Sequence, residues 1–244
     1  MGFYVLIPAR YGSKRLPGKP LINICGKPMV EHVWRRAMQS EAEKVFIVTD
    51  DSRIYSKAKK FGARVLLTDS NHSSGTDRLA EASNLLDLEE DKIVVNVQGD
   101  EPLISPLSIT RVAKILDQYP KADMGSLCSI ITDKALAIDF NKVKVVVNEA
   151  GRALYFSRSL IPFSNKGPWY HHIGLYSYRS AFLKKFSAWL PTPLEKLERL
   201  EQLRAIENGA FVYVSITSEE HSTGVDTAND LELIRSQIKI QSND

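Results

Sequence analysis

The amino-acid sequence predicts a three-layer α/β fold with a largely parallel central sheet and a smaller mixed extension. The 244 residues are 43% hydrophobic and 25% charged, a composition typical of a soluble globular chain. Short apolar runs alternate with stretches of helical pattern, as in βαβ units, where each helix connects two parallel strands. In the second half the expected strands have fewer helices between them, which indicates the mixed extension.

Strands of the central sheet are expected where continuous apolar runs end at turn residues. The run that starts at Phe3 ends at Pro8, and its unbroken apolar character is typical of a parallel strand buried on both faces. The ranges expected as strands in this half are 3–7, 45–48, 65–67 and 93–97, and those expected as helices are 28–40, 52–61, 76–86 and 106–118.

The second half is expected to add strands at 143–147, 153–156, 173–178 and 211–216. One helix there has clear boundaries. Thr192-Pro193-Leu194-Glu195 is a capping box with proline at the first helical position, and Asn208-Gly209 is a stop signal. We expect a single helix between them, whose leucines at 194, 197, 200 and 203 pack in the core or in a dimer contact.

Charge is distributed unevenly along the chain. The formal net charge is +3, yet the first 30 residues hold five Lys and Arg residues and no Asp or Glu. A basic segment on a slightly acidic remainder favours a local anionic ligand over a broad nucleic-acid surface. The two cysteines fit no metal or redox spacing, and the N-terminus shows no secretion signal, so a cytoplasmic location without membrane insertion is expected.

The basic residues follow the first expected strand directly, in the loop 8–21. Ligands of open α/β sheets bind beyond the carboxyl ends of the strands, so this loop lies where a ligand is expected. Gly12 and Gly18 permit close backbone approach, but five residues separate them and a proline follows the lysine, which excludes a Walker A loop. The dinucleotide fingerprint is absent too, so another kind of triphosphate-binding loop is predicted. Its cations are Arg10, Lys14, Arg15 and Lys19.

Two acidic residues are candidate metal ligands. Asp100 follows the expected strand 93–97 and therefore projects toward the same edge of the sheet as the basic loop. A carboxylate beside a triphosphate needs a divalent cation between the two, and Mg²⁺ commonly takes one or two protein carboxylates. Asp226 is the second candidate, although the T-x-x-D pattern that follows it leaves a helix-terminus role open. No D-x-D motif occurs, which argues against a sugar-nucleotide-dependent glycosyltransferase.

The basic loop resembles the signature loop of the sugar-acid cytidylyltransferases, and the match continues through nearly the whole chain. The loop has the sequence Pro-Ala-Arg-Tyr-Gly-Ser-Lys-Arg-Leu-Pro-Gly-Lys-Pro-Leu. Within these enzymes the chain is most similar to the 3-deoxy-manno-octulosonate (Kdo) cytidylyltransferases, also called CMP-Kdo synthetases. Further segments match in order at residues 74–78, 98–102, 153–158, 172–176, 200–204 and 224–227.

This resemblance implies a nucleotidyltransferase-like (nucleotide-diphospho-sugar transferase) fold in one domain, 1–244. Its parts would be a nucleotide half of about 1–120, a sugar-acid and dimerisation half of about 121–220 and a C-terminal helix at 227–240. The resemblance also implies transfer of CMP from CTP to the anomeric hydroxyl of Kdo, with release of pyrophosphate, for lipopolysaccharide synthesis. Two other acceptors stay open. The segment 164–170 is shorter than in many relatives, so the 8-amino analogue of Kdo stays an alternative acceptor. Sialic acid is the second alternative acceptor.

The resemblance implies roles for individual residues as well. Sugar-binding residues are expected at Gln98, Arg158, His172, Tyr176, Glu201 and Gln202, and nucleotide-binding residues at Pro8, Ala9, Arg10, Arg15, Lys19, Ser74, Gly75 and Arg78. Asp100 and Asp226 are the implied ligands of Mg²⁺. Taken alone, several of these have plainer interpretations, such as a core histidine at 172, a solvated helix face at 201–202 and a helix N-terminal arginine at 78.

We expect the anomeric hydroxyl to attack the α-phosphorus of CTP in line, without a covalent enzyme intermediate. The expected catalytic residues are Arg10 and Lys19, which neutralise phosphate charge, and Asp100, which with Asp226 holds the Mg²⁺ that orients the reacting groups. The sequence indicates no general base. The expected partners are CTP, a 3-deoxy-octulosonic acid and a second copy of the chain, but no nucleic acid.

Two other classes of function remain as alternatives to this enzyme. A non-catalytic nucleotide sensor would keep the basic loop without needing paired metal carboxylates. An RNA-binding protein would have aromatic side chains interleaved with the cations, yet Tyr11 is the only aromatic residue between Arg10 and Lys27. The carboxylates and the scarcity of aromatic residues both favour the enzyme.

Overall fold

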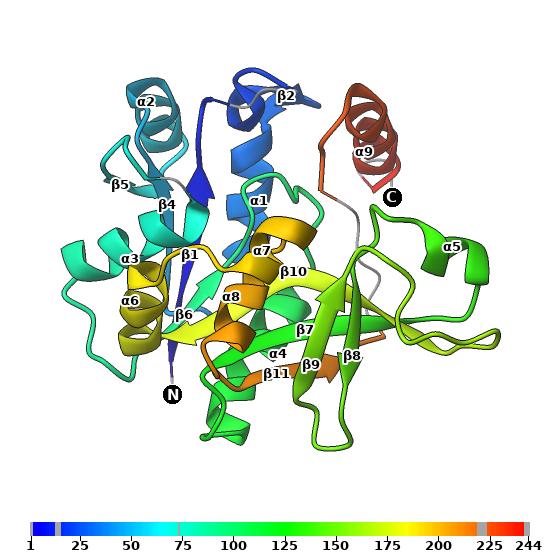
Figure 1. Cartoon of the computed structure of the whole chain (residues 1–244). Coiled ribbons are helices and arrows are strands. Elements are labelled where there is room, and N and C mark those ends of the chain that lie inside the picture. The colour runs from blue at the N-terminus through cyan, green and yellow to red at the C-terminus, as the bar shows by residue number, and fades with distance from the viewer. Residues whose placement is uncertain (1, 13–15, 73, 219–223, 242–244) are drawn as a thin grey trace. The chain divides into compact units, whose positions relative to one another are not determined.

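The computed structural model describes residues 2–12, 16–72, 74–218 and 224–241 (Figure 1). The chain divides into two compact units. The first unit consists of Gly2–Leu88, Val94–Thr110 and Glu220–Asp244, and the second unit consists mainly of Glu89–Ile93 and Arg111–Glu219. Of the expected site residues, Arg15 lies outside the described residues. Among the described helices, none is both long enough and apolar enough to cross a membrane.

The first unit is built on parallel strands that are buried as the apolar runs predict. Strand β1 (Phe3–Ala9) pairs in parallel with β4 (Lys44–Thr49), and β4 pairs in parallel with β5 (Arg64–Leu67). Strand β6 (Ile93–Asn96) lies on the other side of β1, and all four of its residues are buried. The carboxyl ends of β1 and β4 therefore lie at one edge of this sheet.

At the start of two helices of the first unit, the sequence supplies side-chain capping groups. The Asp51 side chain accepts hydrogen bonds from the backbone N–H groups of Arg53 and Ile54 at the start of α2 (Ser52–Lys60). Ser74 and Asp77 form a reciprocal capping box at the start of α3 (Gly75–Leu85). The remaining elements of this unit are η1 (Lys19–Leu21), β2 (Asn23–Ile24), β3 (Lys27–Pro28), α1 (Met29–Ala37) and α9 (Ala228–Gln241).

The C-terminal helix α9, red in Figure 1, belongs to the first unit although it is far from the other elements in sequence. Its buried residues Leu231, Ile234 and Ile238 recur at helical spacing and share one apolar cluster with Ile24 and Met29. Val225 belongs to the same cluster and is fully buried. This packing fixes the chain immediately before α9, where Asp226 lies.

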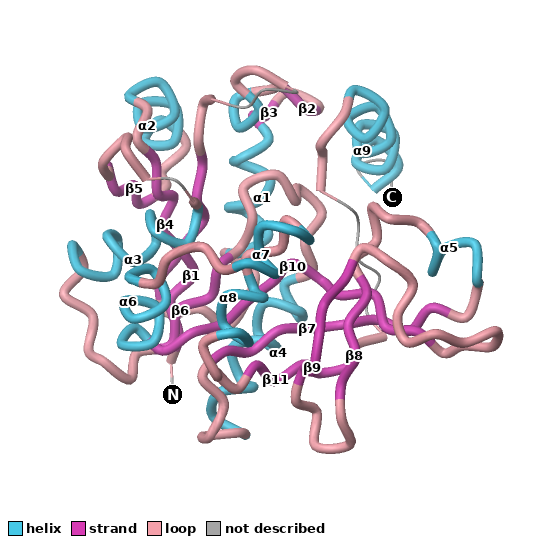
Figure 2. Tube along the Cα trace, viewed as in Figure 1, coloured by secondary structure: helices cyan, strands magenta, loops and turns pink. Residues whose placement is uncertain are grey.

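The second unit contains a mixed sheet, as expected. Strand β10 (Trp169–Arg179) pairs antiparallel with β7 (Met124–Ile131), while β11 (Val212–Ile216) pairs with β7 in parallel. Strands β8 (Lys144–Val147) and β9 (Ala153–Ser157) pair antiparallel, and β8 also contacts β10 (Figure 2). The sequence-based expectation missed β7, because glycine and serine interrupt its apolar residues, and it covered only the second half of β10.

Helices of the second unit are α5 (Lys134–Ile138), α6 (Ser180–Ala188), α7 (Pro193–Glu198) and α8 (Gln202–Glu207), and α4 (Pro106–Gln118) runs from the first unit into the second. The expectation of one helix between Thr192 and Asn208 is wrong. Arg199 adopts the left-handed conformation with φ 56° and ends α7, so a second helix starts only after the corner. Of the spaced leucines, Leu200 and Leu203 are core residues, whereas Leu197 is 79% exposed.

Candidate active site

A pocket of about 540 Å³ lies at the carboxyl ends of β1 and β6, and every residue that lines it belongs to the first unit. Its position agrees with the rule that ligands of open α/β sheets bind beyond the strand ends. The basic loop and the carboxylates expected to act on one ligand thus share one pocket. The lining residues are Pro8, Ala9, Arg10, Gly12, Lys19, Pro20, Gly75, Gln98, Gly99, Asp100 and Asp226.

The two strand ends are brought together by the absence of a side chain at Gly99. A Cβ built on Gly99 would lie 2.6 Å from the carbonyl oxygen of Pro8, a distance that real Cβ atoms do not show. Glycine at this position therefore lets the loop after β6 approach the end of β1 closely. The motif that contains Gly99 gives no sign of this contact, because it depends on the tertiary approach of the two strand ends.

Lys19 follows a turn at Gly18 and lines the pocket. Gly18 has φ 66°, and its N–H donates to the carbonyl oxygen of Tyr11 at 3.1 Å, which holds these two residues together. The short helix η1 starts at Lys19 with proline next in the chain, a residue whose fixed φ suits the first turn of a helix. These local preferences direct the Lys19 side chain toward the carboxylates.

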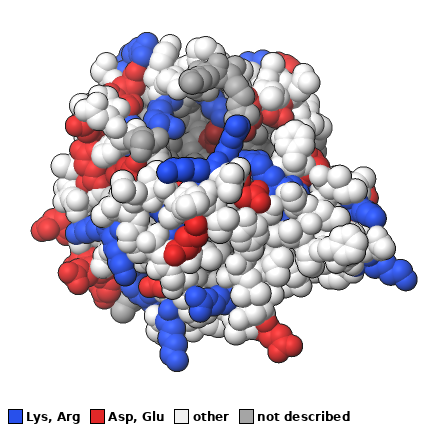
Figure 3. Space-filling model, in the orientation of Figure 1, with Lys and Arg blue, Asp and Glu red and all other residues white. Residues whose placement is uncertain are grey.

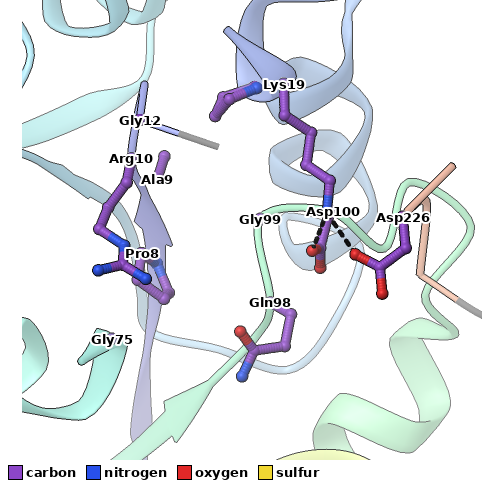
Figure 4. A pocket seen from close by; sticks show the side chains of 11 residues that line it. Pro8, Ala9, Arg10, Gly12, Lys19, Gly75, Gln98, Gly99, Asp100 and Asp226 are labelled. Carbon is purple, nitrogen blue, oxygen red and sulfur yellow. Dashed lines mark hydrogen bonds and ion pairs between the residues drawn. The ribbon is translucent and has the colours of Figure 1, made fainter. Parts of the chain in front are cut away.

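The Lys19 ammonium bridges the two predicted metal ligands (Figure 4). Its Nζ donates to Oδ2 of Asp100 at 2.6 Å and to Oδ1 of Asp226 at 3.0 Å. Burial lowers the pKa of Lys19, but the two carboxylates outweigh that effect and hold the pKa above its usual value. Lys19 is therefore a cation whose charge two carboxylates share.

Asp226 does not cap the helix that follows it. The Asp230 carboxylate accepts hydrogen bonds from the backbone N–H groups of Asp226 and Thr227 at 2.9 and 2.8 Å. The Thr227 hydroxyl in turn accepts from the N–H of Asp230. Because Asp230 performs the capping, the Asp226 side chain is left to point into the pocket, where it meets Lys19.

The carboxylates of Asp100 and Asp226 fit a Mg²⁺ site. The N–H of Val225 donates to the Asp100 carbonyl oxygen at 2.9 Å, which holds the two aspartates close together. Both carboxylates already contact one positive centre, the Lys19 ammonium. In the described part of the chain no group of three or more His, Cys, Asp or Glu residues gathers as a metal site. A carboxylate pair nevertheless suffices for Mg²⁺, which commonly keeps waters and phosphate oxygens as its other ligands.

Two of the expected nucleotide-binding residues have structural roles and do not line the pocket. The side chain of Ser74 caps α3. Arg78 is completely buried, and its guanidinium donates to Asp50 at 2.7 Å, to the Thr68 hydroxyl at 2.5 Å and to the carbonyl oxygen of Asp69. Arg78 therefore has no surface to offer a ligand in this structure, and its geometry matches the plainer interpretation of a helix N-terminal arginine.

Three of the expected sugar-binding residues lie together in the second unit. The hydroxyl of Tyr176 donates to Oε1 of Gln202 at 3.3 Å, and the rings of His172 and Tyr176 lie 5.5 Å apart. His172 and Tyr176 come from β10 on either side of a bulge between Ile173 and Tyr176, a feature that commonly re-aims side chains near functional sites. Gln202 comes from the start of α8, directly after Glu201.

His172 is a neutral histidine whose hydrogen-bonding is fixed by Ser126. Burial, together with His171, lowers the pKa of His172 to about 3. The Ser126 hydroxyl contacts Nε2 of His172 at 2.9 Å and two carbonyl oxygens of β10 at 3.0 and 3.2 Å. Because carbonyls only accept and the hydroxyl has one proton, a Ser126 hydroxyl that donates to either carbonyl accepts from Nε2 of His172, and Nδ1 is then left as an acceptor. Nothing in the sequence pattern singles out Ser126.

The match of this chain to a protein family defines the class of protein. Residues 4–216 match the family model described as cytidylyltransferase. A cytidylyltransferase structure from Leptospira borgpetersenii is 18% identical and has a TM-score of 0.65, a likeness that shows a common fold.

More similar proteins identify the family within that class. Proteins named 3-deoxy-manno-octulosonate cytidylyltransferase from Hahella chejuensis and Marinobacter nauticus are 46% and 47% identical, each over 96% of both chains. A solved structure described as CMP:2-keto-3-deoxy-manno-octonic acid synthetase complexed with CTP is 39% identical, has a TM-score of 0.93 and covers 99% of this chain and 100% of its own. The chain belongs to the 3-deoxy-manno-octulosonate cytidylyltransferase family, and the fold class expected from the sequence is confirmed.

Proposed function

We propose that the protein transfers CMP from CTP to the anomeric hydroxyl of 3-deoxy-D-manno-octulosonate and releases pyrophosphate. Relatives that share nearly the whole length of the chain carry the name of this activity. The observation that supports it most in the structure is the pocket at the strand ends, where Arg10, Lys19, Asp100 and Asp226 lie together. Neither the 8-amino analogue nor sialic acid is favoured by the relatives' names.

The pocket supplies the charge that transfer from a triphosphate needs. In the proposal, Arg10 and Lys19 bind the phosphates and neutralise the charge that develops on the leaving pyrophosphate. The backbone at Pro8 and Ala9 contacts the cytosine base, while Gly75 gives the nucleotide close access to the N-terminus of α3. We assign no residue of the pocket as general base.

Asp100 and Asp226 would hold Mg²⁺. When bound, the ion would polarise the α-phosphate and lower the pKa of the attacking hydroxyl. The chain's own contribution is to keep both carboxylates in place through the Val225 N–H bond and the capping role of Asp230. Because Lys19 contacts both carboxylates, a metal ion held by them would compete with its ammonium, which would then be available to the triphosphate.

The acidic sugar needs a cation for its carboxylate and hydrogen-bonding groups for its hydroxyls. In the proposal Arg158 binds the carboxylate, and the polar atoms of His172, Tyr176, Glu201 and Gln202, all in the second unit, bind the hydroxyls. The neutral state of His172 suits this role, because its Nδ1 can accept a hydrogen bond from an uncharged hydroxyl.

The proposal includes a cytoplasmic homodimer that makes CMP-Kdo for lipopolysaccharide synthesis. Leu197 and Phe163, which are 79% and 93% exposed in the second unit, offer apolar side chains for a contact with a second copy. On the face drawn in Figure 3, Lys and Arg side chains are interspersed with Asp and Glu, a pattern that does not favour nucleic acid as the ligand. Sedimentation of the purified protein tests the dimer.

Pyrophosphate release across the four ribonucleoside triphosphates and a panel of acidic sugars tests the activity. The panel contains Kdo, its 8-amino analogue, sialic acid and galacturonic acid. We expect release only with CTP and with Kdo as the preferred acceptor. Release with sialic acid but not with Kdo would contradict the proposed substrate, and the absence of release with any sugar would contradict the proposed reaction.

A further inference from the structure

Glu198, the last residue of α7, makes an unusual set of contacts with the end of β9. Its Oε1 accepts from the Ser157 hydroxyl at 2.5 Å, and its Oε2 accepts from the backbone N–H of Arg158 at 3.0 Å. The carbonyl oxygen of Glu198 accepts from Nε of Arg158 at 3.1 Å. The hydroxyl of Tyr155 also lies 3.4 Å from Oε1. One residue therefore holds both the backbone and the side chain of Arg158.

The break between α7 and α8 creates this arrangement. Arg199 adopts φ 56° and ψ 48°, which turns the chain sharply after Glu198. In a continuous helix the carbonyl of residue 198 would accept from the N–H of residue 202, whereas here it accepts from Arg158. The corner also places Glu201 and Gln202 at the start of α8, only three and four residues after Glu198.

The contacts with Glu198 hold Arg158 without neutralising its charge. The carboxylate of Glu198 binds the backbone N–H of Arg158 and the Ser157 hydroxyl, whereas the hydrogen bonds of the guanidinium within the described residues run to carbonyl oxygens. Nε and Nη1 donate to the carbonyl oxygens of Glu198 and Phe140. Since neither hydrogen bond brings a negative charge to the guanidinium, the side chain keeps its charge for an anion and is only half-buried.

A second fixed point lies on the other side of Arg158. The completely buried Lys144 donates from Nζ to the carbonyl oxygens of Arg158, Asp139 and Lys142, at 2.6, 2.9 and 2.5 Å. The N–H of Arg158 is thus held by Glu198 and its carbonyl by Lys144. An arginine whose backbone is fixed at both polar atoms loses little conformational entropy when it binds a ligand.

We propose that Glu198 is a positioning residue for the acidic sugar: it aims the guanidinium of Arg158 at the sugar carboxylate. This inference rests on the proposed function, because it takes Arg158 as the group that binds the sugar carboxylate. Glu198 itself touches no reacting atom. No sequence motif marks Glu198 for this role.

Steady-state pyrophosphate release by the full-length protein tests the proposal. The wild type is compared with Glu198→Gln, Arg158→Ala and the double variant, with Kdo varied at saturating CTP and CTP varied at saturating Kdo. Glu198→Gln should raise the KM for Kdo about tenfold and leave the KM for CTP within about twofold, because only the sugar side loses its aligned cation. In the Arg158→Ala background the same substitution should change the KM for Kdo by less than about twofold, since its effect passes through Arg158.

Two further variants guard against a purely structural effect. Ser157→Ala removes one donor to Glu198 without touching Arg158, and it should raise the KM for Kdo in the same direction by a smaller factor. Glu149→Gln makes the same chemical change at an exposed turn between β8 and β9 and should alter neither KM.

The outcomes separate the two claims. Equal changes in both KM values, or full additivity in the double variant, would overturn the positioning role of Glu198. An unchanged KM for Kdo in Glu198→Gln, together with a raised KM for Kdo in Arg158→Ala, would also overturn this role. A wild type that releases no pyrophosphate from CTP and Kdo would instead overturn the proposed function, and with it this inference.

Discussion

Lys19 and Asp100, 81 positions apart in the sequence, form an ion pair of 2.6 Å in the pocket at the strand ends. The Lys19 side chain is 11% exposed and that of Asp100 is 34% exposed, so the ammonium is shielded from solvent while the carboxylate stays accessible from the pocket. The same ammonium contacts Asp226. The pocket thus holds its own cation between two carboxylates. In the proposed reaction the triphosphate would bind the Lys19 ammonium, and the metal ion would bind the carboxylates.

Removal of the Lys19 charge should nearly abolish turnover while the fold is kept. Lys19→Met retains the length of the side chain but supplies no charge, and the loss of one preorganised charge costs about 3–4 kcal/mol, or 10²–10³ in rate. Pyrophosphate release measures the rate, and circular dichroism checks the fold. Lys27→Met, at an exposed lysine of β3, is the matched control. A rate near that of the wild type in Lys19→Met would reject the assignment.

Asp226 and Asp230 should respond differently to substitution. Asp226→Asn should lower turnover about 10²-fold or more through loss of metal affinity. Asp230→Ala should instead cost about 1 kcal/mol of stability through the lost cap of α9 and keep most of the turnover. Turnover, Mn²⁺ binding by electron paramagnetic resonance and urea unfolding separate the two effects. Equal loss of Mn²⁺ affinity in both variants would show that Asp226 acts only through the local backbone.

His172 should make the protein less stable as the pH falls. Its pKa is lowered from 6.5 to about 3, so between these values the unfolded chain binds a proton at His172 that the folded chain does not. The stabilising effect of the neutral ring is complete above pH 6.5 and is lost as the pH falls toward 3. From about pH 6 to about pH 4.5 the wild type should lose about 2 kcal/mol more of its free energy of unfolding than His172→Gln does.

Urea unfolding at the two pH values measures this difference in slope. His72→Gln is the matched control, because His72 is partly exposed and is not among the groups that lower the pKa of His172. Parallel pH dependences for the wild type and His172→Gln would mean that His172 is not held neutral by the fold.

The corner at Arg199 should prefer glycine. The left-handed conformation of an L-residue, here φ 56°, destabilises the fold by roughly 1–2 kcal/mol. Glycine avoids this strain, although its larger conformational entropy in the unfolded chain offsets part of the gain. Arg199→Gly should therefore raise the free energy of unfolding by up to about 1 kcal/mol, whereas the β-branched Arg199→Val should lower it. Urea unfolding measures the free energy of unfolding of the two variants at this exposed site. A lower value for Arg199→Gly than for Arg199→Val would contradict the strained corner.

Sequence patterns located the first unit's pocket because its parts obey a positional rule. Arg10, Lys19 and Asp100 each follow a buried strand, and the carboxyl ends of such strands share one edge of the sheet. Asp226 follows no strand, so a helix-terminus role stayed open from the pattern alone. The structure assigns the capping to Asp230, four residues later.

Features that depend on tertiary contacts could not be predicted in the same way. The buried ion pair of Arg78 with Asp50 and the hydrogen bonds of Ser126 join residues that no local pattern connects. The break at Arg199 conflicts with a clear capping box at Thr192 and a clear stop at Gly209, both of which predict a continuous helix. Tertiary hydrogen bonds of Glu198 outweigh the local preference there.

The measurement that tests the central claim most directly is CTP affinity by titration calorimetry, with and without Mg²⁺, for the wild type and the variant Asp100→Asn/Asp226→Asn. Without Mg²⁺ the double variant should bind CTP more tightly than the wild type, because Lys19 is released and two negative charges are gone. With Mg²⁺ the order should reverse, since only the wild type can hold the ion between the protein and the triphosphate. The same order of affinities under both conditions would contradict a shared site for the metal ion and the triphosphate.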